Sequence, residues 1–192
     1  MYFMGTNLIQ LPSDIPRPLD DGQADHLWGA AFPSVKLLST DGATVATDSF
    51  KNGRYIIYCY PMTGRPDVPL PKGWDSVPGA RGCTPESLMF AQHYAELKNL
   101  GFMVYGLSTQ SQEYQREMVE RLHLPFPILS DSNLLLTKAL MLPTLIVEGQ
   151  TLLKRLTMVV ENGVIRKVFY PVFPPDKHPE EVLYWAKHAG RG

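Results

Sequence analysis

The sequence has little cysteine, little charge imbalance and no long apolar run. Its 192 residues include two cysteines, and 18 Lys and Arg stand against 19 Asp and Glu, so the formal net charge is -1. Without a basic excess that could follow a phosphate backbone, we expect no nucleic-acid partner. No apolar run approaches the roughly 18 to 20 residues that a membrane-spanning helix needs, so we expect no membrane partner either.

The first ten residues also lack the pattern of a secretory signal. Met1–Gln10 contains neither a positively charged start nor a long apolar segment. This favours a cytoplasmic protein in a reducing compartment. In such a compartment two cysteines are more typical of reactivity or burial than of a structural disulfide.

Signals for metals and for phosphate-bearing cofactors are missing as well. None of the five histidines pairs with another His, Cys or Asp at the spacing of a zinc site. The Gly79-Ala80-Arg81-Gly82 segment lacks the Lys-Ser/Thr context of a phosphate-binding loop. We therefore expect neither a metal nor an organic cofactor.

The chain divides into an arm and one domain. Residues 1–25 are rich in Pro and Asp without clear periodicity, as in an arm that lies on the surface or on a partner. Residues 26–192 have the length and apolar content for a single core. Within them, residues of about 62–82 are crowded with Pro and Gly and form a long irregular loop, a kind that is usually functional or disordered.

Strand-like and helix-like segments alternate along the domain. β-Branched and aromatic runs predict strands at 35–38, 44–45, 54–60, 102–107, 126–129, 153–160 and 164–169. Helices are expected at 84–99, after Ser111, at 134–140 and at 179–188, and Leu88, Ala91 and Ala95 can share one apolar face of the first. Asn162-Gly163 indicates a closing hairpin. This order predicts an α/β fold with a central mixed β-sheet flanked by helices.

One cysteine stands where the long loop leads into a helix. In Gly82-Cys83-Thr84-Pro85-Glu86, Pro85 suits a first helical turn, so free backbone N–H groups and the positive end of the helix dipole should face Cys83. Such a setting, with Arg81 nearby in sequence and Arg155 in space, favours the thiolate. A thiolate of this kind can attack a peroxide and become a sulfenic acid. The alternative is a buried, inert cysteine.

Each further candidate also has a structural interpretation. Cys59 lies in an apolar strand and is expected to be a core residue, with a resolving partner for Cys83 as the alternative. Arg155, in the strand at 153–160, either serves the thiol or is a strand arginine that faces solvent or pairs with Glu. Arg81 is expected to be a solvated loop residue. Trp74 is expected to anchor the long loop, with an interface role as the alternative.

Several motifs in a fixed order resemble one known family. The residues concerned are Tyr58-Cys59-Tyr60-Pro61, Gly82-Cys83-Thr84-Pro85-Glu86, and segments at 94–97, 104–108, 126–131, 154–157 and 161–165. They are similar to the active-site region and following segments of peroxiredoxins of the AhpC/TSA-like group, in the bacterioferritin comigratory protein branch, over roughly residues 24–189. The resemblance implies a thioredoxin-like fold, with Cys83 as the peroxidatic cysteine and Arg155 as the arginine that holds thiolate and peroxide. It implies a peroxidase that acts on hydrogen peroxide or organic hydroperoxides.

The sequence departs from the family pattern PxxxTxxC before the cysteine. Ala80 occupies the position of the Thr or Ser, and Pro61 lies 22 residues before Cys83 (83 minus 61) instead of seven. The loop is therefore longer by about 15 residues, in a class of segment that tolerates insertion. The missing hydroxyl could come from Thr63, Ser76 or Thr84, and Thr63 is our candidate because it follows the family-like Tyr60-Pro61.

A second departure concerns the recycling of the oxidised cysteine. Relatives in this branch often carry a resolving cysteine five residues after the first, and this chain has Leu88 there. The resemblance therefore implies a one-cysteine enzyme whose sulfenate is reduced by an external thiol, thioredoxin-like or glutathione-like. The sequence does not determine the oligomeric state, and a homodimer is one alternative.

Two other functions remain as alternatives. A thiol–disulfide oxidoreductase on the same fold is disfavoured, because the chain lacks the C-x-x-C motif that supplies a second thiol. A non-catalytic redox-sensing or binding module derived from a peroxiredoxin is favoured somewhat by Ala80 and the long loop. Peroxide consumption by the purified protein would separate this module from the enzyme.

Overall fold

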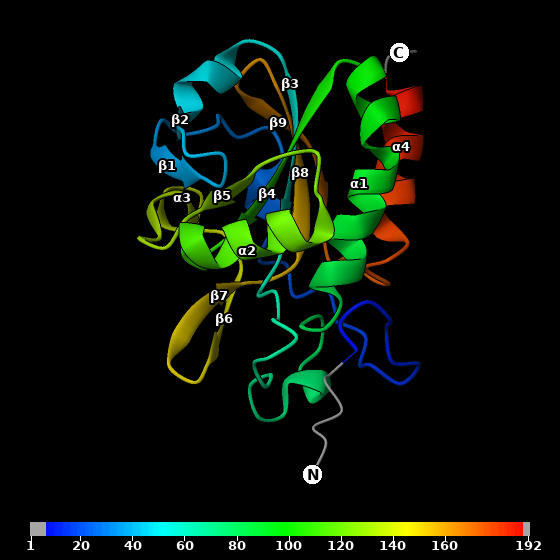
Figure 1. The fold of residues 1–192 in the computed structure, drawn as a ribbon. Helices are drawn as coiled ribbons and strands as arrows, with labels where there is room; N and C mark the ends of the chain where they lie inside the picture. The colour runs from blue at the N-terminus through cyan, green and yellow to red at the C-terminus, as the bar shows by residue number, and fades with distance from the viewer. Residues whose placement is uncertain (1–6, 190–192) are drawn as a thin grey trace.

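The protein is built around one mixed β-sheet. We describe residues 7–189 of a computed structural model; the rest of the expected arm, residues 1–6, and residues 190–192 lie outside the described residues. The seven-stranded sheet has the order β2-β1-β5-β4-β3-β8-β9, and Figure 1 shows it with helices packed around it. Its strands are β1 (Lys36–Ser39), β2 (Thr44–Ala46), β3 (Arg54–Cys59), β4 (Phe102–Ser108), β5 (Ile128–Ser130), β8 (Leu156–Glu161) and β9 (Val164–Phe169).

The sheet is parallel at its centre and antiparallel towards both edges. Strands β3, β4 and β5 run parallel, whereas β1 pairs antiparallel with β5, and β8 with β3. Parallel strands require crossover connections, which α1 (Cys83–Asn99) and α2 (Gln112–Leu122) supply. The predicted α/β fold with a central mixed sheet is confirmed.

The two faces of the sheet carry separate cores. The first core is packed by α1, α2 and α4 (His178–His188), with Phe90, Met118 and Val182 among its members. Figure 1 shows α1 and α4 side by side. The second core lies against α3 (Leu135–Ala139) and the short 3-10 helices Asp25–Leu27 and Thr47–Lys51. Burial of one large apolar side chain in such a core stabilises the fold by roughly 1.5 to 3 kcal/mol.

Strand β3 lies between these cores and alternates between them. Ile56, Tyr58 and Tyr60 point into the first core, while Ile57 and Cys59 point into the second. Successive side chains of a strand face opposite sides of a sheet, so neighbours in sequence are separated by the sheet itself. Because both faces are covered, the strand has no polar face, as its apolar sequence predicted.

The buried face of α1 differs from the predicted one. Phe90 and Leu97 are fully buried, whereas Leu88 is half-buried and Ala95 is exposed. The inward face also carries Glu86 and Ser87, both fully buried. These polar residues interrupt the apolar periodicity, which is why the sequence pattern selected the wrong face.

The predicted strand at 153–160 is also wrong in extent. The chain forms β7 (Gln150–Leu153), which pairs with β6 (Thr144–Val147) in a separate hairpin, and then bends before β8 begins at Leu156. Arg155 therefore lies in a bend between two strands and not within one. The apolar residues on both sides of Lys154-Arg155 concealed the break.

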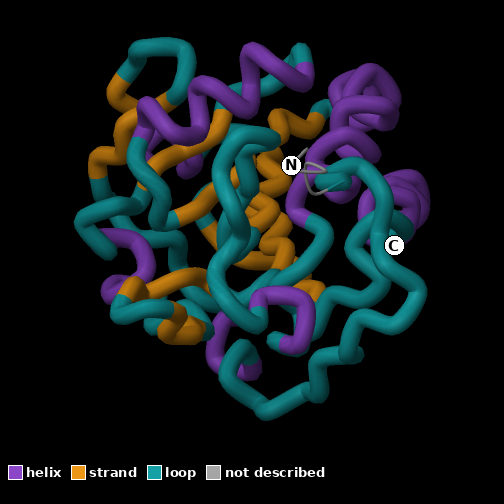
Figure 2. Tube along the Cα trace, turned by 60° about the horizontal axis from the view of Figure 1, so that its bottom comes forward, coloured by secondary structure: helices purple, strands orange, loops and turns teal. Residues whose placement is uncertain are grey.

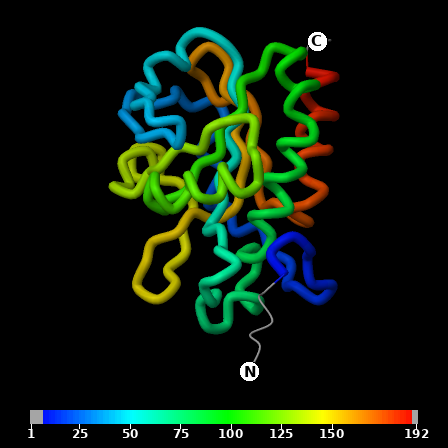
Figure 3. Tube along the Cα trace, in the orientation of Figure 1, coloured from blue at the N-terminus to red at the C-terminus, as the bar shows by residue number. Residues whose placement is uncertain are grey.

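Three segments meet at one end of the sheet. The arm, the long loop after β3 and the β6–β7 hairpin all lie beyond the carboxyl end of β3 in Figure 1, and Figure 3 allows each to be followed by colour. Figure 2 shows this end turned towards the viewer, with loops spread across it. None of the helices in the described part of the chain has the length and apolar character needed to cross a membrane.

Candidate active site

Cys83 is the first residue of α1, and the backbone before it is shaped by Gly82. Gly82 has φ 109, a value that favours glycine, and it precedes the helix directly. A Cβ at this position would lie 2.4 Å from Cγ of Pro175 and 2.8 Å from Cδ2 of Leu11. The close packing leaves no room for a side chain, so glycine is required for the turn that presents the cysteine at the helix start.

Arg155 binds the sulfur directly. Its Nη2 lies 3.1 Å from Sγ of Cys83 and also donates to the carbonyl oxygens of Ala80 and Arg81, at 3.2 and 3.3 Å. Its Nη1 donates to the carboxylate of Glu86. The guanidinium is thus held by four acceptor atoms and cannot swing away from the thiol without breaking several hydrogen bonds. The structure brings together the predicted pair Cys83 and Arg155.

Arg155 and Glu86 form a buried ion pair next to the thiol. Both side chains are almost wholly excluded from solvent. A buried carboxylate without a partner is costly, and one guanidinium offsets that cost. Glu86 comes one helical turn after Cys83, so both side chains face the same guanidinium. Glu86 belongs to the Gly82-Cys83-Thr84-Pro85-Glu86 motif, but nothing in that motif predicts that it is the partner of Arg155.

Burial raises the pKa of the Cys83 thiol, and this effect exceeds the lowering by Arg155. Glu86 raises the pKa further, because a thiolate would be a second anion on the same guanidinium. In agreement, the thiol donates to the carbonyl of Ala80 across 3.7 Å. The expected preference for thiolate is therefore not seen in this closed arrangement. Exposure of the sulfur to water would remove desolvation, which is the largest contribution that raises the pKa of the thiol.

Parts of the arm and of the long loop together form a lid over the sulfur of Cys83. Cys83 is 3% exposed, and the void next to it measures about 10 Å³. Leu8 of the arm, Met62 and Leu70 of the long loop, and Trp74 line this void. A volume of this size holds at most about one water molecule, so a hydroperoxide needs an opening movement to reach the sulfur.

Within the lid, hydrogen bonds join the arm to the long loop. Arg81 is buried, and it donates to Asp75 and to the carbonyl of Asn7, both at 2.7 Å. The prediction that Arg81 is a solvated loop residue is therefore wrong, because this arginine joins the loop to the arm. Trp74 is buried among Met62 and other apolar side chains, which confirms its predicted role as an anchor.

The three candidate hydroxyls lie in different surroundings. Thr63 donates to Oε1 of Gln110 across 3.2 Å, and Ser76 donates to the carbonyl of Gly73. Thr84 is buried and lines the void next to Cys83. The backbone N–H of Met62, one residue before Thr63, lowers the pKa of the Cys83 thiol. A catalytic part for the Thr63 hydroxyl stays a prediction.

Cys59 lies in the other core. It is fully buried among apolar side chains on the face of β3 that points away from Cys83. Burial strongly raises the pKa of its thiol. Its expected place in the core is confirmed, and the sheet separates it from the sulfur of Cys83.

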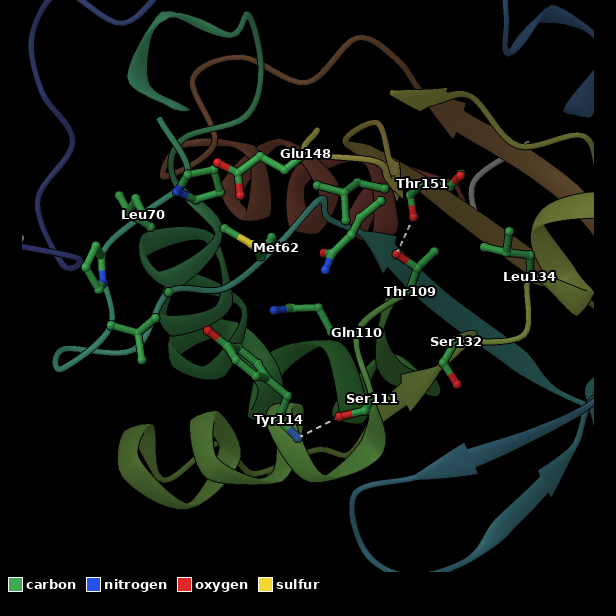
Figure 4. A pocket seen from close by; sticks show the side chains of 16 residues that line it. Met62, Leu70, Thr109, Gln110, Ser111, Tyr114, Ser132, Leu134, Glu148 and Thr151 are labelled. Carbon is green, nitrogen blue, oxygen red and sulfur yellow. Dashed lines mark hydrogen bonds between the residues drawn. The ribbon is translucent and has the colours of Figure 1, made fainter. Parts of the chain in front are cut away.

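A larger cavity lies beside the covered thiol. It has a volume of about 590 Å³ and is bounded by the long loop, the turn from β4 into α2, the turn between β5 and α3, and the β6–β7 hairpin. Figure 4 shows Met62 and Gln110 reaching towards its middle, between Glu148 on one side and Tyr114 on the other. No sequence pattern signals this cavity, because four segments that are distant along the chain form it.

The comparisons with sequences agree with one another. A sequence model described as Redoxin matches residues 28–183. Peroxiredoxin Q of Sedum lineare, a chloroplastic protein, is 30% identical over 156 residues, which cover 81% of this chain and 75% of that protein. A putative peroxiredoxin Q of Oryza sativa subsp. indica is also 30% identical over 81% of this chain. The matched region spans 64% of the length of that rice protein.

Solved structures share the fold. The peroxidoxin BcpB of Mycobacterium tuberculosis superposes with a TM-score of 0.69 at 20% identity, covering 86% of this chain and 98% of the other. The peroxiredoxin Q of Xanthomonas campestris gives a TM-score of 0.65 at 20% identity, covering 93% and 100%. At these identities the likeness concerns the fold alone.

Proposed function

The chain belongs to the redoxin family, as a peroxiredoxin of the bacterioferritin comigratory protein and peroxiredoxin Q branch, and from this membership we propose that it is a thiol-dependent peroxidase. Its substrates are hydrogen peroxide or organic hydroperoxides. The observation that carries the proposal is the 3.1 Å contact from Arg155 Nη2 to the sulfur of Cys83 at the start of α1. A buried arginine fixed on a thiol supplies the charge that an anionic nucleophile and a peroxide oxygen both need.

The chemistry begins when the lid opens and the Cys83 thiol loses its proton. The thiolate attacks the terminal oxygen of the hydroperoxide, an S–O bond forms, and the O–O bond breaks. The sulfur becomes a sulfenic acid, and the other oxygen leaves as water or an alcohol after taking up a proton. Arg155 and the backbone N–H of Met62 stabilise the negative charge that moves from sulfur to oxygen.

The cycle closes when an external thiol reduces the sulfenic acid. Position 88, one helical turn further on, is Leu, and Cys59 faces the opposite core. An external thiol of thioredoxin-like or glutathione-like type, in a reducing compartment such as the cytoplasm, completes the proposal. Thr63 is kept as a supporting residue of the site, through the loop backbone that it shares with Met62.

A direct assay tests this function. The purified protein should consume hydrogen peroxide with dithiothreitol as reductant, and consumption should stop when Cys83 is changed to Ser. A protein that binds or senses redox partners without catalysis would form at most one oxidised cysteine per chain and would not turn over. Absence of turnover with both hydrogen peroxide and cumene hydroperoxide would contradict the proposal.

A further inference from the structure

The cavity of about 590 Å³ shares a wall with the reactive thiol. Met62, Gly64 and Leu70 line both this cavity and the small void next to Cys83. The backbone N–H of Met62 also faces the thiol and lowers its pKa slightly. A molecule in the cavity would therefore be separated from the void at the sulfur by residues that line both spaces, and one of them, Met62, has an unbranched, flexible thioether side chain.

The backbone next to Met62 is held in place by a side chain of the cavity lining, so a ligand in the cavity can affect its position. Gln110 accepts a hydrogen bond from the backbone N–H of Thr63 at 2.9 Å and donates to the carbonyl of the same residue at 3.2 Å. Figure 4 shows the Gln110 side chain within the cavity. A ligand that competes for this amide would loosen the backbone next to Met62 and open a path to the sulfur.

The size and enclosure of the site favour a small reductant. A volume of about 590 Å³ lies within the usual range of roughly 300 to 1,000 Å³ for small-molecule sites. A protein thiol would have to bring a whole domain against a sulfur that is 3% exposed beneath the arm and the loop. A small thiol needs only the adjoining cavity and a displaced Met62.

The lining specifies the chemistry of the ligand. Hydroxyl and amide side chains are frequent in it, including Thr109, Gln110, Ser132 and Gln150. Ser132 and Gln150 are exposed in the lining, so a polar thiol could form hydrogen bonds to them, whereas an alkyl chain could not. Glu148 is the charged residue among the sixteen described residues of the lining, which include neither Lys nor Arg. The cavity therefore suits a neutral or cationic ligand and disfavours a carboxylate.

We propose that this cavity binds the thiol that recycles Cys83, and that this thiol is a polar, neutral or cationic molecule of low molecular mass. The inference rests on the peroxidase function proposed above. The bound thiol attacks the sulfenic acid, forms an S–S bond to Cys83, and releases the sulfenic oxygen as water. A second thiol molecule then attacks the mixed disulfide, which yields the small disulfide and the free Cys83 thiol.

The test measures the second half of the cycle alone. Cys83 is first oxidised with one equivalent of hydrogen peroxide, and dimedone trapping confirms the sulfenic acid. The rate of its reduction is then followed with cysteamine, 2-mercaptoethanol and 3-mercaptopropionate, which are similar in size and differ in charge. Because these thiols differ in intrinsic reactivity, the quantity compared is the cysteamine-to-mercaptopropionate rate ratio of each variant relative to the wild-type protein.

Glu148→Lys should lower this ratio by roughly tenfold, since the charge facing the ligand is reversed. Glu120→Lys, at an exposed position of α2 outside the cavity lining, is the matched control and should leave the ratio unchanged. Ser132→Trp, which fills space in the cavity, should slow reduction by neutral 2-mercaptoethanol roughly tenfold relative to Gln92→Trp on the exposed side of α1.

Several outcomes would overturn the assignment. Equal ratios in Glu148→Lys and Glu120→Lys would remove the charge argument. A Ser132→Trp protein that slows with cumene hydroperoxide but not with thiols would make the cavity a substrate site. Faster reduction by thioredoxin than by any small thiol at equal thiol concentration, in both Trp variants, would identify a protein reductant. Failure to form a sulfenic acid would instead contradict the peroxidase function itself.

Discussion

The two cysteines occupy opposite faces of one sheet and are both buried, yet their surroundings differ in kind. Cys59 is enclosed by apolar side chains, and no arginine contacts it among the described residues. Cys83 is equally hidden from solvent, but its sulfur touches the guanidinium of Arg155, which is itself paired with Glu86. Under the proposed function, burial alone therefore does not distinguish an inert thiol from a reactive one.

The distinction lies in what stabilises the charged form once the sulfur is reached. For Cys59 nothing offsets the desolvation that raises its thiol pKa. For Cys83 the same desolvation is opposed by Arg155 and by a backbone N–H, and it is imposed by a lid that consists of loop and arm. Local opening of a lid costs little free energy, whereas exposure of a residue in the core around Cys59 requires the domain to unfold.

The largest expected effect separates the two thiols directly. Cys83→Ser should reduce peroxide turnover by more than roughly 10³-fold, because the nucleophile is lost while a side chain of similar size keeps the fold. Cys59→Ser is the matched control and should keep turnover with dithiothreitol nearly unchanged. Peroxide consumption measures both. Similar losses in the two variants would end the distinction between them.

The second prediction concerns Arg155, the group that contacts the sulfur of Cys83 and has no counterpart at Cys59. Arg155→Met should slow the peroxide step by more than about tenfold, or about 1.4 kcal/mol in barrier height. The change also leaves Glu86 buried without its partner, which should destabilise the fold by about 3 to 5 kcal/mol.

The double variant Arg155→Met with Glu86→Gln separates the two effects. It should recover much of the lost stability, measured by urea unfolding, without recovering the rate of sulfenic acid formation. Wild-type second-order kinetics with hydrogen peroxide in either variant would exclude Arg155 from the chemistry.

The third prediction concerns the carboxylate that competes for the arginine. Glu86 raises the pKa of Cys83, so Glu86→Gln should lower that pKa and extend thiolate reactivity to lower pH. The pH dependence of iodoacetamide labelling of Cys83, read by mass spectrometry, measures the change. Glu96→Gln, on the exposed side of the same helix, is the control. A profile that moves to higher pH would reverse the assigned role of Glu86.

The smallest expected effect concerns the lid. Leu11 of the arm packs against Gly82 at the start of α1, so Leu11→Ala should loosen the cover and speed labelling of Cys83 by roughly two- to fivefold. Leu19→Ala, in the same arm but 84% exposed, should leave labelling unchanged. Cys59 should stay unlabelled in both. Equal labelling of the two variants would show that the arm does not control access.

Features that depend on a few neighbouring residues, such as turns, caps and apolar strands, could be predicted from the sequence. The turn at Asn162-Gly163, the cap at Ser111 and the apolar run of β3 all predicted what the structure contains. The juxtaposition of Cys83 with Arg155 followed from a family resemblance, because the two residues are 72 positions apart and no local signal predicts the contact.

Two of the failures share a cause. Glu86 and Arg81 are charged residues that the fold buries, and burial of a charge depends on a partner that is distant in sequence or hidden in a loop. The inward face of α1 and the solvation of Arg81 were mispredicted for this reason, whereas apolar residues on both sides concealed the bend at Arg155. The cavity beside Met62 could not be predicted, since it exists only when four separate segments meet.

The most direct test of the account is intact-mass analysis after one equivalent of hydrogen peroxide. If Cys83 acts alone, each chain should gain one oxygen atom at Cys83, convertible to a dimedone adduct, and excess peroxide should add a second oxygen to give the sulfinic acid. The sheet between the two sulfurs opposes a disulfide, which would need their Cα atoms within about 7 Å. A loss of two hydrogens per chain, reversed by reductant and absent in Cys59→Ser, would show instead that Cys59 resolves Cys83 and that the two faces of the sheet are not independent.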